Sequence, residues 1–245
     1  MSLGPPEGNG PLRRERLRTA RLYFCCGARP RDEDPEALLR SALGGGVDIL
    51  QIREKELGRA EIERAAGTFR RVCDTYSTLF IVNDDPDLAR ACDADGVHVG
   101  EVDEVEAARQ VLGPDAIVGV STHSPEQIAA ADAAAVDYIA VGPIWETPTK
   151  PGRPAVGLEL ISHAAEHAHH PFFAIGGISP LNAEEVVRAG ARRLVVVRAI
   201  RDAPHPEVAA EALRRSFAAA DGGSPNIQDA LFDTPAPWRG VAPGG

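Results

Sequence analysis

The segment ILQIREKELGRAEIERAAGTFRRVCDTYSTLFIV, residues 49–82, contains the unit that decides the fold. It begins with a short apolar run at Ile49–Ile52, continues through a stretch of helical character over 59–76, and returns to an apolar run at Leu79–Val82. Strands this short and this apolar are typical of a parallel sheet that is covered by helices. The segment therefore predicts one strand–helix–strand repeat.

The same alternation extends along the chain in both directions. The other apolar runs are Leu22–Cys25, Gly96–Val99, Ile117–Val120, Tyr138–Val141, Phe172–Ile175 and Leu194–Val197, and the other helical stretches are 35–43, 86–91, 103–112, 125–134, 158–168, 181–189 and 205–220. Eight strand–helix repeats favour a closed (β/α)8 TIM barrel, an α/β fold that commonly reaches this length as one domain. The repeats place that domain over residues 18–221.

Local signals set the helix boundaries. A capping side chain precedes a proline at four predicted helix starts, and glycines follow several predicted helix ends. The capping pairs are Asp34-Pro35, Asp85-Pro86, Ser124-Pro125 and Ser179-Pro180, and the glycines are Gly44–Gly46, Gly113 and Gly190. An open, doubly wound sheet is the alternative topology. It would normally carry GxGxxG after the first strand, and CCGARPRDED at 25–34 is not such a motif.

Composition and charge limit the binding partners and the cellular location that we expect for this protein. The net charge of −10 makes nucleic acid and anionic membrane improbable partners. No apolar run approaches the roughly 18 residues of a membrane span, and the first residues lack the apolar core of a signal peptide. We therefore expect a cytoplasmic protein whose cysteines are reduced. We expect mobile tails at 1–17 and 222–245, because proline and glycine are concentrated at 1–12 and 222–245.

In a barrel of this kind, the active site lies where the carboxyl ends of the strands run into the following loops. After the second strand, alternation sends Gln51, Arg53 and Lys55 to one side. This group suits a diphosphate and a heterocycle, although a solvated charged loop explains it equally well.

Carboxylates follow the third and fourth strands. Asp84 and Asp85 come after Asn83, and Glu101 and Asp103 follow the fourth strand. Two carboxylates with cations nearby suit Mg²⁺ that also binds a substrate phosphate. Asp85 is explained well by helix capping, and Asp103 could also be a cap, so Asp84 is the stronger candidate ligand.

The remaining strand ends carry hydroxyls, glycines and cations. Thr147 and Thr149 stand beside Lys150 in the longest loop, a pattern that predicts an anion-binding surface. The loops after the seventh and eighth strands are the usual phosphate site of this fold. Here they contain Gly176-Gly177 and Val197-Arg198. Ser121 follows the fifth strand.

Histidines offer weaker candidates. His123 is better explained as a barrel-rim histidine with satisfied hydrogen bonds than as an acid or base. His163 and His167, four residues apart, are better explained as an exposed face of an outer helix than as metal ligands.

Taken together, these segments resemble the thiamine-phosphate synthase family from about Leu22 to Ala220. The likeness is carried by QIREK (51–55), FIVNDD (80–85), ADGVHVGEVD (94–103), GVSTHS (119–124), VGPIWETPTK (141–150), AIGGI (174–178) and VVVRAI (195–200). The resemblance implies that 4-amino-5-hydroxymethyl-2-methylpyrimidine diphosphate ionises with loss of pyrophosphate. The nitrogen of a thiazole phosphate, or of its carboxylated form, then captures the resulting cation.

The resemblance also implies residue roles. Gln51, Arg53 and Lys55 would receive the pyrimidine and its diphosphate, with Asn83, Ser121 and Lys150 beside them; Arg53, Lys55, Lys150 and Ser121 would carry the catalysis. Asp84 and Asp103 would hold Mg²⁺. Thr147, Thr149, Gly177, Val197 and Arg198 would bind the thiazole phosphate.

Two positions depart from the family pattern. Glu101 replaces a glutamine in GEVD, and Arg198 replaces a small hydroxyl residue. The second change matters only if the hydroxyl, rather than the backbone N–H, binds the phosphate. Two rival functions stay open: a thiazole tautomerase that uses His123, and a non-catalytic sensor of the thiazole phosphate. The sequence leaves the oligomeric state open, and a homo-oligomer is compatible with it.

Overall fold

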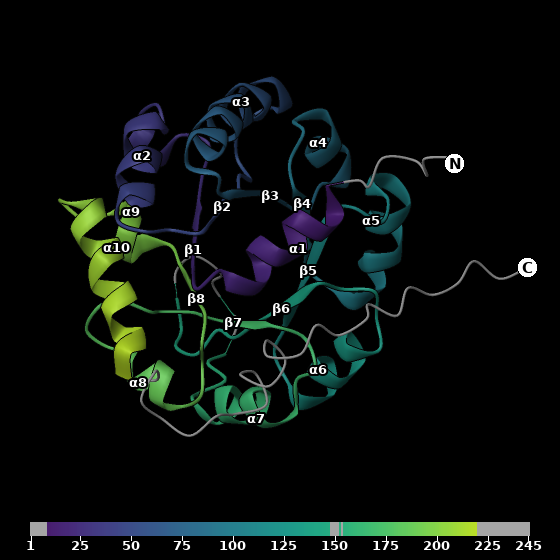
Figure 1. The fold of residues 1–245 in the computed structure, drawn as a ribbon, viewed down its shortest axis with the longest axis vertical. Coiled ribbons are helices and arrows are strands. Elements are labelled where there is room, and N and C mark those ends of the chain that lie inside the picture. The colour runs from purple at the N-terminus through teal and green to yellow at the C-terminus, as the bar shows by residue number, and fades with distance from the viewer. Residues whose placement is uncertain (1–8, 148–151, 153, 220–245) are drawn as a thin grey trace, which may run out of the picture.

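The computed structural model describes residues 9–147, 152 and 154–219 of the chain. All eight strands are parallel and form one closed barrel in chain order, with β1 beside β8 (Figure 1). Their bounds are β1 Leu22–Cys26, β2 Ile49–Ile52, β3 Leu79–Asn83, β4 Gly96–Val99, β5 Ile117–Thr122, β6 Tyr138–Val141, β7 Phe172–Ile175 and β8 Leu194–Val196. The barrel predicted from the alternation of apolar runs is confirmed, and the open sheet is excluded.

Helices form the outer ring of the barrel. They are α2 Glu36–Gly44, α3 Arg59–Tyr76, α4 Pro86–Ala91, α5 Val105–Leu112, α6 Pro125–Asp132, α7 Glu159–His167, α8 Ala183–Arg188, α9 Arg198–Arg201 and α10 Pro206–Arg215, with 3₁₀ turns η1 Pro30–Asp32, η2 Val102–Glu104 and η3 Ser216–Ala219. Asp85 and Ser124 cap α4 and α6 as predicted, accepting hydrogen bonds from backbone N–H groups at 2.7 and 3.3 Å. The short α9 was not predicted. No helix in the described ranges is both long and apolar enough to cross a bilayer.

Strand alternation divides the apolar side chains into two groups. Leu22, Phe24 and Cys26 of β1 face the helices and join the large core between sheet and ring. Tyr23 and Cys25 face inward and join a smaller core that fills the barrel with Ile117 and other inward-facing side chains. Gly119 makes room in this interior, because a Cβ there would come within 2.1 Å of the Tyr138 ring.

Aspartates close the amino-terminal end of the barrel. Asp48, Asp95 and Asp137 directly precede β2, β4 and β6 and accept backbone N–H groups at the start of the preceding odd-numbered strand, at Leu22, Phe80 and Val118. Each also pairs with an arginine of an outer helix, namely Arg214, Arg70 and Arg109 respectively. These charge-assisted bonds join sheet and ring at the end remote from the strand carboxyl termini.

Helix α1, Gly10–Thr19, crosses this same end of the barrel (Figure 1). Arg13 pairs with Asp95 at 2.9 Å, and Arg14 pairs with Asp137 at 2.8 Å. The helix was not expected, because it lies largely within the segment 1–17 that the sequence predicts as a tail. It buries only Gly10 and Leu17 and is otherwise held by ion pairs, so it has no apolar stripe to reveal it. The predicted tail residues 1–8 and 222–245 lie outside the described part of the chain.

Candidate active site

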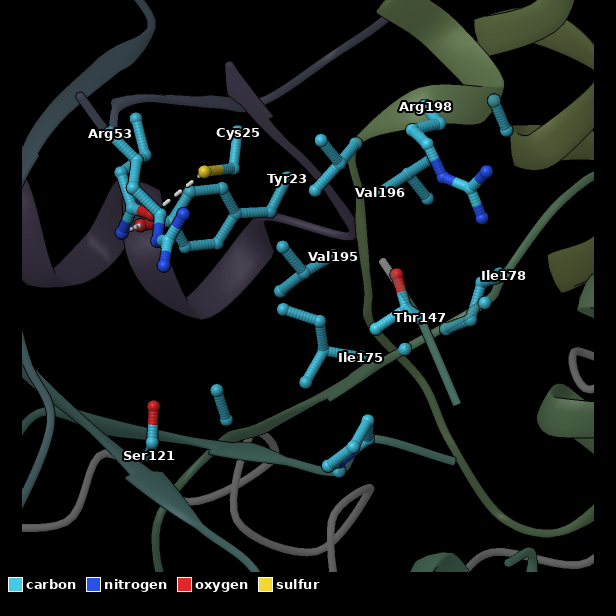
Figure 2. A pocket seen from close by; sticks show the side chains of 18 of the residues that line it. Tyr23, Cys25, Arg53, Ser121, Thr147, Ile175, Ile178, Val195, Val196 and Arg198 are labelled. Carbon is cyan, nitrogen blue, oxygen red and sulfur yellow. Dashed lines mark hydrogen bonds between the residues drawn. The ribbon is translucent and has the colours of Figure 1, made fainter. Parts of the chain in front are cut away.

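A pocket of about 350 Å³ opens at the carboxyl ends of the strands (Figure 2). The structure brings together eight of the residues that the sequence singles out, because all of them line this pocket. They are Gln51, Arg53, Asn83, Ser121, Thr147, Gly177, Val197 and Arg198. The prediction that these strand ends converge on one cavity is confirmed; their individual roles stay predictions.

A second, wider cavity of about 730 Å³ adjoins the first. Lys55 and Asp84 line it, while Arg53, Asn83 and Ser121 belong to the walls of both cavities. The site therefore has two connected chambers with a shared wall. We call the first the inner pocket and the second the outer pocket.

The outer pocket has mixed charge. Lys55 Nζ lies 3.9 Å from Asp84 Oδ2, and both side chains are about half exposed. Such an exposed pair adds little stability, so both groups remain available to a ligand. Arg53 contributes a buried Nε that has no hydrogen-bond partner among the described residues. Buried donors are normally paired, and this nitrogen belongs to a side chain that lines both cavities.

The third and fourth strand ends hold their carboxylates differently. Asp84 has a left-handed backbone (φ +62°), and its N–H donates to the carbonyl of His98 at 2.8 Å. This places Asp84 at the wall of the outer pocket, whereas the Asp85 carboxylate caps α4 and pairs with Arg59. Asp103 lies in η2 with an exposed side chain and lines neither chamber. The capping role predicted for Asp85 is therefore confirmed, and the ligand role of Asp84 stays a prediction.

Glu54 holds the loop that carries Lys55. Its Oε1 accepts the backbone N–H groups of Lys55 and Glu56 at 2.8 and 3.0 Å, and its Oε2 accepts that of Ala28 at 3.1 Å. Partial burial alone would raise the pKa of Glu54, but these backbone bonds outweigh it and lower the pKa overall. The carboxylate thus ties the loop after β2 to the loop after β1.

The loops after β6 and β7 pack against each other at the inner pocket. Ile144 N–H donates to the Ile175 carbonyl at 2.9 Å, and Gly177 has φ +70°. A Cβ at Gly177 would lie 3.0 Å from the Cβ of Trp145, so a larger residue would be both strained and crowded. Thr147 ends the described part of this loop, and Thr149 and Lys150 lie outside the described residues.

Arg198 begins α9 at the edge of the inner pocket, where its side chain is exposed. Figure 2 shows Arg198, Thr147 and Ile178 on one side of the pocket, with Arg53 and Cys25 on another. The inner pocket therefore has a cationic rim at β8 that is separate from the cations at β2.

Two of the histidine predictions concern positions at the barrel rim and on α7. His123 lines the inner pocket, and its Nδ1 is hydrogen-bonded to the carbonyl of Gly142. His163 and His167 stack on α7 with ring centroids 4.3 Å apart. Within the described ranges, no cluster of three or more His, Cys, Asp or Glu side chains could form a metal site by itself.

None of the four cysteines forms a disulfide, and all carry thiols as predicted. Cys25, Cys26 and Cys73 are buried, and Cys92 is partly buried. Burial is the main cause that raises the pKa of the Cys26 and Cys73 thiols, so both are inert at neutral pH.

Sequence reasoning missed a buried hydrogen-bond network in the wall of the inner pocket. It runs through Cys25, Gln51, Tyr23, Tyr138, His98 and Ser121, with successive donor–acceptor distances of 2.7–3.1 Å. Only Gln51 and Ser121 were singled out, because they stand at strand ends. The other four lie within strands, where period-two alternation could have placed them inside the barrel.

Comparisons with known proteins identify the family of the chain. Residues 22–200 match the family model described as thiamine monophosphate synthase. A thiamine-phosphate synthase of Acidothermus cellulolyticus is 50% identical over 208 residues, covering 83% of this chain and 98% of that protein. One of Mycobacterium tuberculosis is 46% identical over 222 residues, covering 86% and 100%.

One solved structure has the same fold as this chain and is also similar to it in sequence. A thiamine phosphate pyrophosphorylase from Pyrococcus furiosus superposes with a TM-score of 0.76 at 33% identity, covering 84% of this chain and all of that one. The family match spans β1 to α9 and so includes every strand of the barrel and all the strand ends that line the two pockets. The chain therefore belongs to the thiamine monophosphate synthase family.

Proposed function

We propose that this chain condenses 4-amino-5-hydroxymethyl-2-methylpyrimidine diphosphate with 4-methyl-5-(2-phosphoethyl)thiazole to give thiamine phosphate and pyrophosphate, or with the carboxylated form of the thiazole to give the same products and CO2. One observation carries the proposal: Lys55 lines only the outer pocket and Arg198 only the inner pocket, while Arg53, Asn83 and Ser121 line both. A reaction that joins two anionic substrates needs adjacent binding sites for both, with the reacting atoms at the boundary.

The outer pocket is the diphosphate half of the site. Arg53 and Lys55 supply positive charge where the leaving diphosphate accumulates negative charge, and Asn83 supplies an amide to its oxygens. Lys150, which lies outside the described residues, stays a prediction for the same role. In an acidic protein with a net charge of −10, this local charge is what makes the pocket receptive to a polyanion.

The residues at this pocket fit Mg²⁺. Mg²⁺ is usually held by one or two carboxylates together with substrate phosphates and water, so it does not need a cluster of three protein ligands. Asp84 provides a half-exposed carboxylate at the pocket wall that is only loosely paired with Lys55. Asp84 would hold the ion, and Asp103 stays the predicted second ligand. When bound, Mg²⁺ neutralises charge on the diphosphate and makes it a better leaving group.

The inner pocket receives the two rings and the second phosphate. Gln51 and Ser121 offer hydrogen bonds to the aminopyrimidine and its diphosphate from neighbouring strand ends. Thr147, Gly177 and the backbone at Val197 and Arg198 form the phosphate site for the thiazole, on the side where this fold commonly binds phosphate. Thr149 stays a prediction in this group.

The chemistry then follows from positioning. The C–O bond to the diphosphate breaks, leaving a pyrimidinylmethyl cation that the amino-substituted ring stabilises. The thiazole nitrogen then donates its electron pair to that carbon and forms the C–N bond. The pyrophosphate that formed when the C–O bond broke is released with the product. Ile175, Ile178 and Val195 line the inner pocket and limit the water that would otherwise capture the cation. No proton transfer by a strong base is required.

A direct test separates this reaction from its rivals. Purified protein is given the pyrimidine diphosphate, the thiazole phosphate and Mg²⁺, and pyrophosphate release is followed. A thiazole tautomerase that uses His123 would release none and would isomerise the thiazole carboxylate phosphate instead. A non-catalytic sensor would bind thiazole phosphate without turnover, and Asp84→Ala would leave its affinity unchanged.

A further inference from the structure

The hydrogen-bond network in the wall of the inner pocket has a single consistent direction. We call Cys25, Gln51, Tyr23, Tyr138, His98 and Ser121 the buried relay. Its members come from β1, β2, β4, β5 and β6, and each is less than 9% exposed. At this depth an unused donor or acceptor is costly, so the placement of the protons is constrained.

The direction is set at the first two links. The Cys25 thiol donates to Oε1 of Gln51 at 3.0 Å, so the other atom of the amide, Nε2, faces Tyr23 and donates to its hydroxyl oxygen at 2.7 Å. Burial is the main cause that raises the pKa of Tyr23 and Tyr138 well above the ordinary value, so both keep their protons. The Tyr23 proton therefore needs an acceptor other than Gln51 Nε2.

Tyr138 is that acceptor. Among the described residues, the Tyr23 hydroxyl has two polar partners, Gln51 and Tyr138, and the side chain is 1% exposed. If Tyr138 donated to Tyr23 instead, the Tyr23 proton would be buried without a partner. Tyr23 hence donates to Tyr138 across 3.1 Å, and Tyr138 must donate onward to Nδ1 of His98, also at 3.1 Å.

The last links reach the substrate pocket. With Nδ1 accepting, neutral His98 carries its proton on Nε2 and donates it to Ser121 Oγ at 3.0 Å. Ser121 then has its own proton left to donate, and it lines both the inner and the outer pocket. The hydroxyl is thereby specified as a donor toward the pocket.

We propose that Tyr23, Tyr138 and His98 are positioning residues: the buried relay holds His98 as the neutral Nε2–H tautomer and makes Ser121 an obligate hydrogen-bond donor to an acceptor on the pyrimidine diphosphate. This inference rests on the proposed function for the identity of the ligand. The tautomer and the direction of the bonds depend only on the protein.

The tautomer is tested in the ligand-free full-length protein. Histidine is labelled with ¹⁵N, and the His98 ring signals are assigned by their loss in His98→Gln, or by their shift in Tyr138→Phe if the glutamine variant does not fold. The relay predicts a protonated Nε2 and an unprotonated Nδ1 at neutral pH. A proton on Nδ1 overturns it. This readout needs no turnover, so failure of the proposed function would leave it intact.

A double-mutant cycle tests whether the relay acts through Ser121. Tyr138→Phe removes the hydroxyl but keeps the ring against Tyr23, His98 and Phe173. We expect it to lower kcat/KM for the pyrimidine diphosphate about tenfold in the wild-type background and less than about twofold in a Ser121→Ala background. KM for the thiazole phosphate stays unchanged.

Tyr76→Phe is the matched control, because Tyr76 is 41% exposed at the end of α3 and its loss of a hydroxyl should not change the kinetics in either background. Equal fold-losses from Tyr138→Phe in both backgrounds would overturn the relay's action through Ser121.

Discussion

Glu54 accepts the backbone N–H of Ala28 at 3.1 Å, and this bond joins the loops after β2 and β1 at the edge of the outer pocket. Because the same carboxylate accepts the N–H groups of Lys55 and Glu56, one side chain fixes the path of the segment that presents Lys55. These backbone bonds to Glu54 also contribute to the free energy of unfolding.

The bonds to Glu54 predict a pH-dependent contribution to the free energy of unfolding. The folded-state pKa is lowered from 4.5, so the stabilisation is complete above about pH 4.5 and is lost as the pH falls through the lower folded-state value. Glu54→Gln should therefore be less stable than wild type at pH 7, and this deficit should be smaller at pH 3. Denaturant unfolding at both values measures the difference. Glu56→Gln on the same loop is the control, and an equal deficit for Glu54→Gln at both values would refute the account.

Asp137 predicts a large structural effect at the other end of the barrel. Its carboxylate, 5% exposed, pairs with Arg14 and Arg109 and accepts the Val118 N–H. Asp137→Ala removes the carboxylate that both guanidinium groups and the Val118 amide share, so we expect a loss of about 3–5 kcal/mol in the free energy of unfolding. The surface pair of Asp87 and Arg90 gives the comparison, since Asp87→Ala should cost less than about 1 kcal/mol. A similar cost for the two variants would contradict the arrangement.

Adjacent aspartates after β3 predict opposite responses to metal. Asp84 lines the outer pocket, while Asp85 caps α4. Asp84→Asn should raise the Mg²⁺ concentration for half-maximal rate by about tenfold or more, because it removes an anionic ligand. Asp85→Asn keeps a capping side chain and should leave the Mg²⁺ dependence unchanged. Titration of Mg²⁺ in both variants, and in Asp103→Asn, assigns the ligands; equal Mg²⁺ requirements for wild type and Asp84→Asn would exclude Asp84.

Arg198 predicts a substrate-specific effect. Its guanidinium stands at the edge of the inner pocket where the resemblance leads one to expect a small hydroxyl residue. If the side chain contacts the phosphate, Arg198→Ser should raise KM for the thiazole phosphate about tenfold, in line with the loss of a charge-assisted hydrogen bond. KM for the pyrimidine diphosphate should not change. Arg188→Ser on α8 controls for the loss of a surface cation; an unchanged KM in Arg198→Ser would show that the backbone alone binds this phosphate.

The sequence predicts the barrel and much of the site because both depend on short-range patterns. Apolar runs separated by helical stretches locate the strands, and the fold then dictates that residues directly after them converge. Arg53, Asn83 and Gly177 were found in this way. Asp84 could be distinguished from Asp85 because Pro86 identifies the latter as a cap.

Other features depend on long-range contacts that no local pattern reveals. Helix α1 is held by Arg13 and Arg14 reaching Asp95 and Asp137, which lie about 80 and 120 residues away along the chain. His98 and Tyr138 lie in strands whose other residues are core, so their meeting inside the barrel depends on closure of the sheet. For Asp103 the sequence predicts more than the structure shows. Its place in GEVD predicts a metal ligand, whereas its side chain lines neither pocket.

The stoichiometry of the products tests directly whether this protein condenses the two substrates. The protein is incubated with the pyrimidine diphosphate, the thiazole phosphate and Mg²⁺, and thiamine phosphate and pyrophosphate are quantified by mass spectrometry. The account predicts that both products form in equal amounts, only when both substrates are present, and at a rate that Arg53→Lys lowers about a hundredfold. Absence of thiamine phosphate with folded wild-type protein, across a range of Mg²⁺ concentrations, would contradict it.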